Sequence, residues 1–462
     1  MSRFALNVLL VAFLSLSPVW ATGEEKNACR LATFQSDVTP PLNSHPLIWI
    51  DPVKTVEDPL AAKGVVLECD GQRVVLCSVD WCGLCNGSHR LFAGKIAAAA
   101  EVPLSQVALH CIHQHTAPYT DGDAQELLNA TENPPKYVDA AFVEQVSDRL
   151  AAAVREACGR WEPFDQVGIG VGRVEQVAAT RRVKTEDGKI RVRYSACKDP
   201  GLRAMPEGNI DPVLKTITLA RAGKPLVRMH YYAVHPQSFY GDARVSADFP
   251  GHAREALQRK EGVFQIYFTG CAGDVTAGKY NDGAPEARTR LTQRLSAGME
   301  AAVAGTKLAP VGQCRWDATE VSLPPRTDPP WNEPESLKKI GNTALPGAVR
   351  ARAACCVASA RRADRPYAVA ALTLGPATIL HLPSECLIEY QHYAQRSRSD
   401  RFVAVAAYGD LGPGYVCPAS AFEEGGYEPT ASHVAPASEA ILKAAIDRVL
   451  GSEKANPGDK KP

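Results

Sequence analysis

Three histidines lie close together in the segment from Val107 to Pro118. His110, His113 and His115 follow an apolar run, and a proline ends the segment. Residues two apart on an extended strand point to the same side, so a strand reaching this far would place His113 and His115 on one face. Imidazoles are common ligands of Zn²⁺. The segment is therefore a candidate corner of a metal site, although a short H-x-H motif equally fits two hydrogen-bonded loop histidines.

Three further candidates stand just after apolar runs that are typical of strands. His235 follows the run 226–234, Glu385 comes shortly after a Leu-Pro pair, and Tyr415 closes a Gly-Pro-Gly loop. With His113 they offer two imidazoles, a carboxylate and a phenolate, a donor set that Zn²⁺ accepts while keeping a position for water or substrate. Each also has a structural interpretation: a core imidazole, a charge at a helix N-terminus, or an aromatic ring covering the core.

The elements that must position these residues alternate along the whole chain. Alternating and continuous apolar runs predict strands, and apolar residues spaced three and four apart predict helices. The strands are expected at 64–69, 73–79, 107–113, 167–177, 214–219, 226–235, 263–268, 319–323, 368–374, 378–382 and 402–408, and the helices at 86–100, 140–157, 252–259, 286–304, 348–362, 387–396 and 437–450. This alternation predicts an α/β fold, a single large mixed α/β domain over residues 22–451 with a metal site at strand ends.

Local signals refine this pattern at several points. The pairs Asp70-Gly71 and Asp187-Gly188 favour hairpin turns. Ser88 is a candidate N-cap for the helix at 86–100. Residues 22–60 are rich in proline and weakly patterned, so we expect them to wrap the domain without regular structure.

The overall charge restricts the kind of partner. The chain has 462 residues, with 51 Lys and Arg and 51 Asp and Glu, so its formal net charge is zero. A nucleic-acid-binding surface is normally basic, which argues against such a partner for the whole surface.

The first 21 residues have the features of a secretory signal. Arg3 precedes an apolar run at 4–14, and small residues follow towards Ala21. The run is short for a membrane span, and no later stretch is longer, so we expect a soluble mature protein that is exported to the periplasm or secreted. The alternative is a retained N-terminal anchor. The tail 452–462 is expected to be frayed.

Fourteen cysteines are many for a chain of this length. Export would make disulfides chemically possible, but spacing does not reveal their pairing. Cys82 and Cys85 form a C-x-x-C motif for which we favour a structural role, since no second such pair is present. Cys355 and Cys356 are adjacent, so we expect each to pair outward.

Several short motifs carry a resemblance to one enzyme family. The segment 113–118 resembles the H-x-H-(S/T)-x-P loop of the neutral/alkaline, non-lysosomal ceramidases, and 233–236 is similar to that family's second histidine segment. The loop 273–276 resembles its G-D-V-S loop, and 383–385 stands where the family has Pro-Gly-Glu. A later stretch with Tyr408, Tyr415, Glu424 and Tyr427 resembles its Tyr/Glu-rich region. The order and spacing agree from about residue 30 to 450.

The resemblance implies a zinc amidohydrolase that cleaves an N-acyl bond with a zinc-activated water. The metal ligands it implies are His113, His235, Glu385 and Tyr415. His115 corresponds to the residue beside the scissile amide. Zinc would polarise the carbonyl and lower the pKa of bound water to about 7.

Three more residues take implied roles in catalysis or binding. Tyr427, like His115, could support the oxyanion or protonate the leaving amine, and Thr276 keeps a hydroxyl where the family has serine. Arg181 corresponds to a substrate-contacting arginine, although a solvated charge at a strand end is an equally good interpretation.

This sequence departs from the family in ways that concern the substrate. Ala277-Gly278 replaces Ser-Pro after Thr276, and Thr-Ala-Pro-Tyr replaces Ser-Gly-Pro-Gly after His115, which reshapes the mouth of the pocket. The chain ends near its last helix, so we expect no counterpart of the family's C-terminal β-sandwich. We expect a small-molecule or lipid-like acyl amide, an N-acyl sphingoid base or another acylated amine, together with peripheral contact to a membrane.

Two other functions stay open at this point. An exported binding protein could keep the metal for stability alone. The chain could also be a zinc esterase, because zinc-bound hydroxide does not by itself select the leaving group. The oligomeric state is not indicated.

Overall fold

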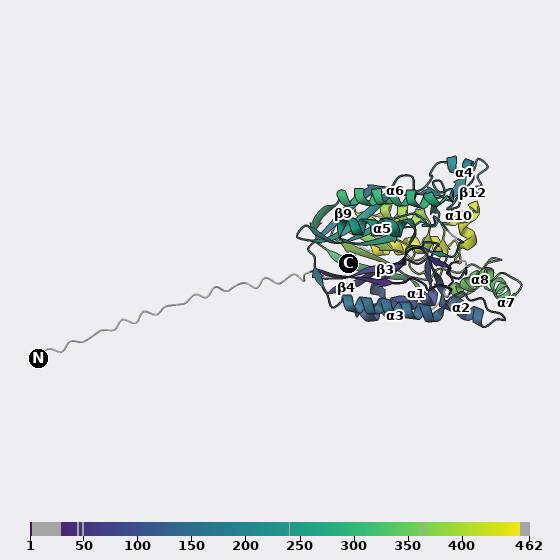
Figure 1. Cartoon of the computed structure of the whole chain (residues 1–462), viewed down its shortest axis with the longest axis horizontal. Coiled ribbons are helices and arrows are strands. Elements are labelled where there is room, and N and C mark those ends of the chain that lie inside the picture. Colours follow the sequence, from purple (N-terminus) through teal and green to yellow (C-terminus); the bar gives the residue numbers. More distant parts are fainter. Residues whose placement is uncertain (2–28, 44–45, 49, 240, 363–364, 453–462) are drawn as a thin grey trace, which may run out of the picture.

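The computed structural model describes residues 1, 29–43, 46–48, 50–239, 241–362 and 365–452 (Figure 1). Nearly all of the expected signal at 1–21 and of the expected tail at 452–462 lies outside these residues. Three main sheets and eleven helices make up the described fold, so the expected mixed α/β class is confirmed.

The first two sheets have five strands each. One has the order β6 (Val107–Cys111), β4 (Gln72–Val79), β3 (Ala61–Cys69), β1 (Arg30–Asp37) and β8 (Glu162–Pro163). The other has the order β16 (Phe264–Thr269), β14 (Lys224–Tyr232), β13 (Val213–Arg221), β9 (Gln166–Arg173) and β18 (Lys307–Pro310).

The third sheet has four strands, and five two-stranded pairs complete the β structure. The third sheet has the order β19 (Cys314–Val321), β20 (Tyr367–Leu374), β21 (Ala377–His381) and β23 (Phe402–Ala406). The small pairs are β10 (Ala179–Thr180) with β17 (Val275–Thr276), β11 (Arg182–Lys184) with β12 (Ile190–Val192), β15 (Arg244–Val245) with β2 (Thr55–Val56), β22 (Glu385–Cys386) with β24 (Tyr415–Val416), and β5 (Gly83–Cys85) with β7 (Tyr119–Asp121).

Helices cover the outer faces of the three sheets. They are α1 (Asn86–Ala100), α2 (Gly122–Asn129), α3 (Ala140–Ala157), α4 (Pro200–Ala204), α5 (Asp248–Glu261), α6 (Pro285–Ala304), α7 (Glu333–Gly341), α8 (Gly347–Ala360), α9 (Ile388–Ser397), α10 (Ala419–Glu424) and α11 (Ser438–Leu450). Helices α1 and α3 lie along one side of the strands and α5 and α6 along the opposite side, while α4, α7, α8 and α10 gather at one end (Figure 1). Helices α9 and α11 pack on the third sheet.

The core between the sheets follows from the alternation of side chains along each strand. Val65 and Leu67 of β3 point inward, towards Ile217 of the second sheet and Ile379 of the third, in one buried cluster. Val66, between them in sequence, packs on the opposite face in the cluster that contains α1 and α3. A strand with apolar residues on both faces is what two covering layers require.

One parallel pair in each main sheet sets the position of the functional residues. β4 runs parallel to β6, β14 to β16 and β21 to β23, whereas the other pairings within these sheets are antiparallel. Backbone hydrogen bonds join the carboxyl ends of these pairs: Cys111 N donates to Tyr408 O at 2.8 Å, and Ala407 N donates to Thr269 O at 2.9 Å. The three sheets therefore deliver the loops after these strands to one place.

Most of the expected elements are present. The hairpins through Asp70-Gly71 and Asp187-Gly188 form β3–β4 and β11–β12, and the helix expected at 140–157 is α3 with those same bounds. Its N-cap is Asp139, whose carboxylate accepts from Phe142 N. These elements depend on local turn and capping chemistry, which is why the sequence pattern predicts them well.

Three local expectations are wrong. Residues 22–60 contain a regular strand, because β1 pairs with β3 along its whole length despite its proline-rich surroundings. Ser88 does not cap α1: it is buried, and its hydroxyl accepts from Gly122 N instead. Helix α7 lies in a proline-rich stretch where no helix was expected, with Asn332 as its cap.

The cysteines also differ from expectation. Cys29 and Cys69 form a disulfide that links the start of β1 to β3, and the other twelve are free. Cys355 and Cys356 are free and buried, so the expected outward pairing is wrong. Among the helices that the structure describes, none combines the length and apolar character that a membrane span requires.

Candidate metal centre

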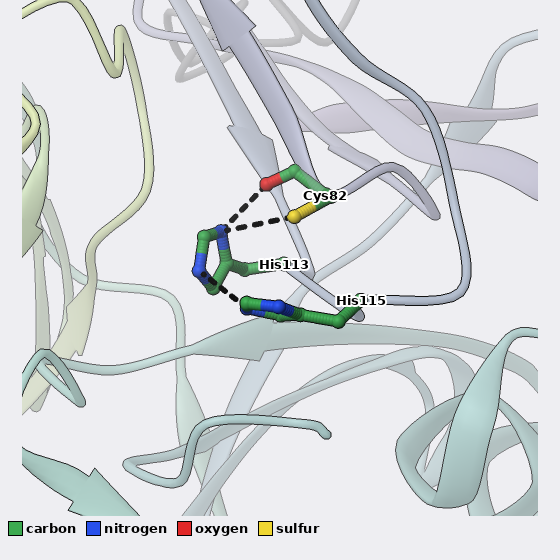
Figure 2. A group of neighbouring side chains, drawn as sticks. All are labelled: Cys82, His113 and His115. Carbon is green, nitrogen blue, oxygen red and sulfur yellow. Dashed lines mark hydrogen bonds between the residues drawn. The ribbon is translucent and has the colours of Figure 1, made fainter. Parts of the chain in front are cut away.

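Three imidazoles from two distant segments converge at the carboxyl ends of the strands. The Nε2 atom of His235 lies 3.0 Å from Nε2 of His113 and 2.9 Å from Nε2 of His115, and the latter two are 3.3 Å apart. His113 and His115 project from the same loop towards one another (Figure 2). The expected pairing of His113 with His235, which are far apart in sequence, is therefore present.

A buried carboxylate completes this cluster. Oε2 of Glu385 lies 3.1 Å from Nε2 of His113 and 3.9 Å from Nε2 of His235. This oxygen is buried, yet within the described part of the chain no donor makes a hydrogen bond to it. An ionised oxygen left in this state is costly, so its surroundings favour a positively charged occupant.

The hydrogen bonds of Nδ1 in His113 and His235 show that Nε2 of each ring faces the cluster with a lone pair. Nδ1 of His113 donates to the carbonyl of Cys82 at 2.6 Å, and Nδ1 of His235 donates to the carbonyl of Ala272 at 3.2 Å. A carbonyl oxygen only accepts, so in a neutral imidazole Nδ1 holds the proton and Nε2 is unprotonated. Lone pairs of His113 and His235 therefore face each other and the Glu385 carboxylate.

This arrangement fits a tetrahedral metal ion. Bonds of about 2.0–2.1 Å from zinc to nitrogen separate two tetrahedral ligand atoms by roughly 3.3–3.4 Å. Nε2 of His113 lies 3.0 Å from Nε2 of His235 and 3.1 Å from Oε2 of Glu385, close to that edge length, and the third distance, from His235 Nε2 to Glu385 Oε2, is 3.9 Å. Backbone carbonyls that hold the far nitrogens are also the usual support of metal-binding histidines. The buried His, Cys and Glu groups can therefore hold a metal ion.

The protonation states agree with this interpretation. Burial lowers the pKa of His235 and of His115 well below the ordinary value, and the neighbouring His113 lowers both further. Burial raises the pKa of Glu385, but His113, Tyr415 and Arg181 outweigh it, so its net shift is downward. His235 and His115 are thus neutral imidazoles at neutral pH, beside an ionised Glu385 carboxylate.

The loop that carries His113 begins earlier than the sequence pattern predicted. β6 ends at Cys111, so strand alternation does not explain why His113 and His115 meet. His113 N donates to Trp81 O at 3.0 Å, and its φ of 75° is left-handed, which turns the imidazole towards the cluster. Ser384 and Tyr408 also have left-handed φ values, of 71° and 61°. Such strain is common at binding sites, where the surroundings hold it in place.

The other two segments are held by short strand pairings. His235 N donates to Val275 O at 2.8 Å, and His235 forms a bridge with Thr276. Glu385 pairs in register with Tyr415 through β22 and β24, which places the two expected ligands side by side on neighbouring strands.

Arg181 lies behind Tyr415. Its Nη2 donates to the Tyr415 hydroxyl at 3.1 Å and to the Gly273 carbonyl, and its Nε donates to Glu428 at 2.8 Å. Its guanidinium carbon is 5.0 Å from the centre of the Tyr427 ring. Arg181 and Glu428 are both buried, so this ion pair is a fixed support for the tyrosine.

A cavity of about 380 Å³ opens onto the cluster. His115, Glu385, Tyr415 and Tyr427 line it, whereas Arg181 and Thr276 do not. Its remaining walls are largely apolar or aromatic: Ile48, Ile50, Tyr119, Tyr137, Ala348, Val349, Ala351, Cys355, Gly414 and Ala431, with Arg352 and His433.

Thr276 is fully buried and serves the backbone. Its hydroxyl donates to Arg193 O at 3.4 Å and accepts from Gly278 N at 3.3 Å. Its position beside His235 makes it a support of that segment. The catalytic role expected for Thr276 and the substrate contact expected for Arg181 stay predictions, and the cavity does not reach either side chain.

Two residues at the site were not assigned from the sequence. The Tyr408 ring stacks on His113 with centres 4.5 Å apart, and its hydroxyl lies 3.4 Å from Nδ1 of His235. Cys82 accepts from His113 with its carbonyl, and its sulfur is 3.8 Å from the same nitrogen (Figure 2). Cys82 comes shortly after the strand expected at 73–79, and Tyr408 is the last residue of the strand expected at 402–408, so a position at a strand end was the available signal.

Cys82 offers a second way to assemble a metal site. Cys82, His113 and His115 have ligand atoms within 4.8 Å of one another, as do His113, His235 and Glu385. Burial raises the pKa of the Cys82 thiol well above its ordinary value, which disfavours the thiolate that binds metals. Its sulfur also faces the protonated nitrogen of His113. The set with His235 and Glu385 is therefore the better one.

Comparison with solved structures identifies a shared fold. The neutral ceramidase from Pseudomonas aeruginosa superposes with a TM-score of 0.68 and 16% identity, over 93% of this chain and 75% of that chain. A structure described as a ceramidase complexed with C2 gives a TM-score of 0.68 and 14% identity, over 92% of this chain and 75% of that chain. At these identities the likeness shows the fold alone. No protein-family model matches the chain, and no curated protein matches its sequence.

Proposed function

We propose that this chain is an exported zinc-dependent amide hydrolase that cleaves an N-acyl bond. The observation that carries the proposal is the meeting of three imidazole Nε2 atoms with a buried, unpartnered carboxylate oxygen at the wall of a cavity. The ceramidase-like fold supports the same reaction class.

Four side chains would hold the metal: His113, His235, Glu385 and Tyr415. Two neutral imidazoles, a carboxylate and a phenol suit Zn²⁺, which then leaves a position open towards the cavity. When bound, zinc lowers the pKa of a water to about 7 and polarises a carbonyl. Arg181 donates to the Tyr415 hydroxyl and so holds that ring in position.

His115 and Tyr427 would act on the substrate from the cavity wall. Both line the cavity, and Nε2 of His115 lies 3.3 Å from Nε2 of His113. A neutral imidazole at this position can carry a proton to the leaving amine, and a phenol can donate to the developing oxyanion. The Tyr427 ring is 5.8 Å from that of Tyr415, which sets its orientation.

The cavity suggests the class of substrate. Its volume of about 380 Å³ and its largely apolar walls suit an acyl chain next to an amide. Both solved structures of the same fold are described as ceramidases, which supports a lipid-like acyl amide for this chain as well. Such a substrate would bring the protein into peripheral contact with membranes.

Export is supported by one structural feature. The disulfide between Cys29 and Cys69 would persist in an oxidising compartment, as expected if residues 1–21 direct secretion. The domain limits of 22–451 belong to the same proposal.

The experiment is metal analysis combined with hydrolysis of an N-acyl amide such as N-dodecanoylethanolamine. We expect about one zinc per chain, loss of hydrolysis after chelation, and recovery with zinc. His113→Ala should lose the metal and lower kcat/KM by about a thousandfold or more. His252→Gln is the matched control, since His252 pairs with Asp58 and does not line the cavity.

Two outcomes would favour other functions. A metal-loaded protein that turns over neither amides nor esters would indicate a binding protein, and turnover of esters alone would indicate an esterase. Zinc retained at full occupancy in His113→Ala would refute the ligand set.

A further inference from the structure

One arginine in the cavity has no acidic partner. Arg352 lies on α8, lines the cavity, and donates to Thr430 O at 3.2 Å. Within the described residues no carboxylate lies within ion-pair distance of it, whereas Arg361, the C-cap residue just after α8, pairs with Glu333 at 2.6 Å. Arg352 is itself exposed at the mouth of this cavity, and an arginine without a counter-charge beside a cavity is a ready binding group for an anion.

A second cavity continues from the first. It has a volume of about 280 Å³ and shares Val349, Arg352 and His433 with the larger one. Lys339 also lines it, and its ammonium group donates to Pro330 O at 2.9 Å. Arg352 therefore stands where the two cavities meet, with a second cation on the far side.

The balance of charge in the two cavities is positive away from the metal centre. Glu385, which belongs to that centre, is the one carboxylate among the described residues that line either cavity. His433 does not add charge, because burial, with Arg352 nearby, lowers its pKa to about 4. The positive charge comes from Arg352 and Lys339.

We propose that the substrate carries an anionic group, a carboxylate or a phosphate, which Arg352 binds while the amide lies at the metal centre. This inference rests on the proposed hydrolase function. The planar guanidinium offers paired N–H donors that match both groups, and Lys339 adds a point charge. The walls at Ile48, Ile50 and Ala348 take the alkyl chain. The substrate class is thus an N-acyl amino acid or an N-acyl aminoalkyl phosphate rather than a neutral amide.

The test compares substrates with one acyl chain and different heads. N-Dodecanoylglycine and N-dodecanoylphosphoethanolamine carry the anion, and N-dodecanoylethanolamine and N-dodecanoylglycinamide are neutral. The zinc-loaded wild type should favour an anionic substrate in kcat/KM by about tenfold or more, and the faster of the two anionic substrates identifies the head group.

Variants of Arg352 test whether this residue causes the preference for anionic substrates. In Arg352→Gln the kcat/KM for the anionic substrates should fall by about tenfold, mainly through KM, while the neutral substrates change by less than about twofold. Arg352→Lys should recover part of the loss because it keeps the charge. Arg361→Gln, at the C-cap of α8, is the matched control, and every variant is assayed at a temperature at which it is fully folded.

The failure of this inference is distinct from the failure of the proposed function. Equal kcat/KM for neutral and anionic substrates, or no change in Arg352→Gln, would overturn the inference and leave the hydrolase intact. If the wild type turns over neither class, calorimetric titration with N-dodecanoylglycine decides. If the wild type binds N-dodecanoylglycine and Arg352→Gln binds it more weakly, the anion site is supported although the hydrolase function is not. If the wild type does not bind it, the anion site is refuted.

Discussion

Two groups of buried histidines occupy the same part of this protein and differ in what they can do. His113, His115 and His235 form the candidate metal centre, while His110 pairs with His381 in the core between the sheets. His110 and His113 belong to one short segment, on either side of the end of β6 at Cys111. Burial lowers the pKa of both His110 and His381, to about 3 for the former.

The difference lies in how the ring nitrogens are matched. Nδ1 of His110 donates to Ala407 O at 2.8 Å, so its Nε2 accepts from Nδ1 of His381 at 3.0 Å. That contact joins a donor to an acceptor and leaves Nε2 of His381 as the one nitrogen of this pair without a hydrogen-bond partner among the described residues. At the candidate centre, Nε2 lone pairs of His113 and His235 face each other and a carboxylate, and only a cation reconciles them.

The comparison shows that clustering and burial of histidines do not by themselves make a metal site. Among the described residues, two groups of side chains are close enough to share a metal ion, and neither group contains His110 or His381. These two histidines also do not line either of the two cavities. Converging lone pairs, an unpartnered carboxylate oxygen and access from a cavity are what distinguish the candidate centre.

The largest expected effect comes from removing a ligand of the candidate centre. His235→Ala should leave less than about a tenth of the wild-type zinc and lower amide hydrolysis by about a thousandfold or more, because the remaining donors no longer enclose the ion. Elemental analysis and initial rates measure both. Full zinc content in His235→Ala would remove the distinction between the two groups.

A substitution in the core pair of His110 and His381 should lower stability and leave zinc binding unchanged. His381→Ala leaves a cavity and takes away the donor to His110, so the free energy of unfolding should fall by about 2–4 kcal/mol. The zinc content per folded chain should equal that of the wild type. Urea unfolding and elemental analysis measure the two quantities, and loss of zinc in the folded variant would contradict the assignment.

The pH dependence of stability in His381→Ala gives a second test of the core pair. A buried histidine whose folded pKa lies below its unfolded value binds fewer protons when folded, so it costs stability as pH falls through about 6.5. Between pH 7 and pH 5 this amounts to about 2 kcal/mol for one such group. Metal-free wild type should lose stability on acidification, and His381→Ala should lose about 2 kcal/mol less.

One buried acid acts against this trend. Burial raises the pKa of Asp121 to about 7, so its contribution to stability falls as pH rises from about 4 to 7 and it partly offsets the histidines. Urea unfolding at pH 5 and pH 7 in the presence of a chelator measures the sum. An equal pH dependence in wild type and His381→Ala would show that His381 is protonated alike in the folded and unfolded states.

The smallest expected effect concerns a neighbour of the ligands. Tyr408→Phe keeps the ring stacked on His113 and removes the hydroxyl 3.4 Å from Nδ1 of His235. Outer groups of this kind change metal affinity by about tenfold or more, so we expect a tenfold weaker Kd for zinc by chelator competition. Tyr390→Phe is the control, because its hydroxyl donates to Cys417 O instead. Equal effects in both variants would assign the change to general loss of stability.

Local patterns along the chain are enough to predict several elements and the candidate ligands. The hairpin at Asp70-Gly71 and helix α3 follow from turn chemistry, capping and apolar spacing, which act over a few residues. His113, His235, Glu385 and Tyr415 were identifiable because each stands where an apolar run gives way to a loop. Strand β1 was not, since its regularity comes from pairing with β3 and not from its own pattern.

The meeting of these residues depends on how the sheets are arranged in three dimensions. Three parallel strand pairs in three sheets deliver their loops to one place, and no local pattern encodes how sheets are arranged. The groups that set the imidazole protons are the backbone carbonyls of Cys82 and Ala272, which every residue possesses. The sequence likewise does not show that Arg352 lacks an acidic partner among the described residues, because that depends on which side chains surround it in the folded chain. Short-range order is thus encoded locally, whereas the chemistry of the site arises from contacts between distant segments.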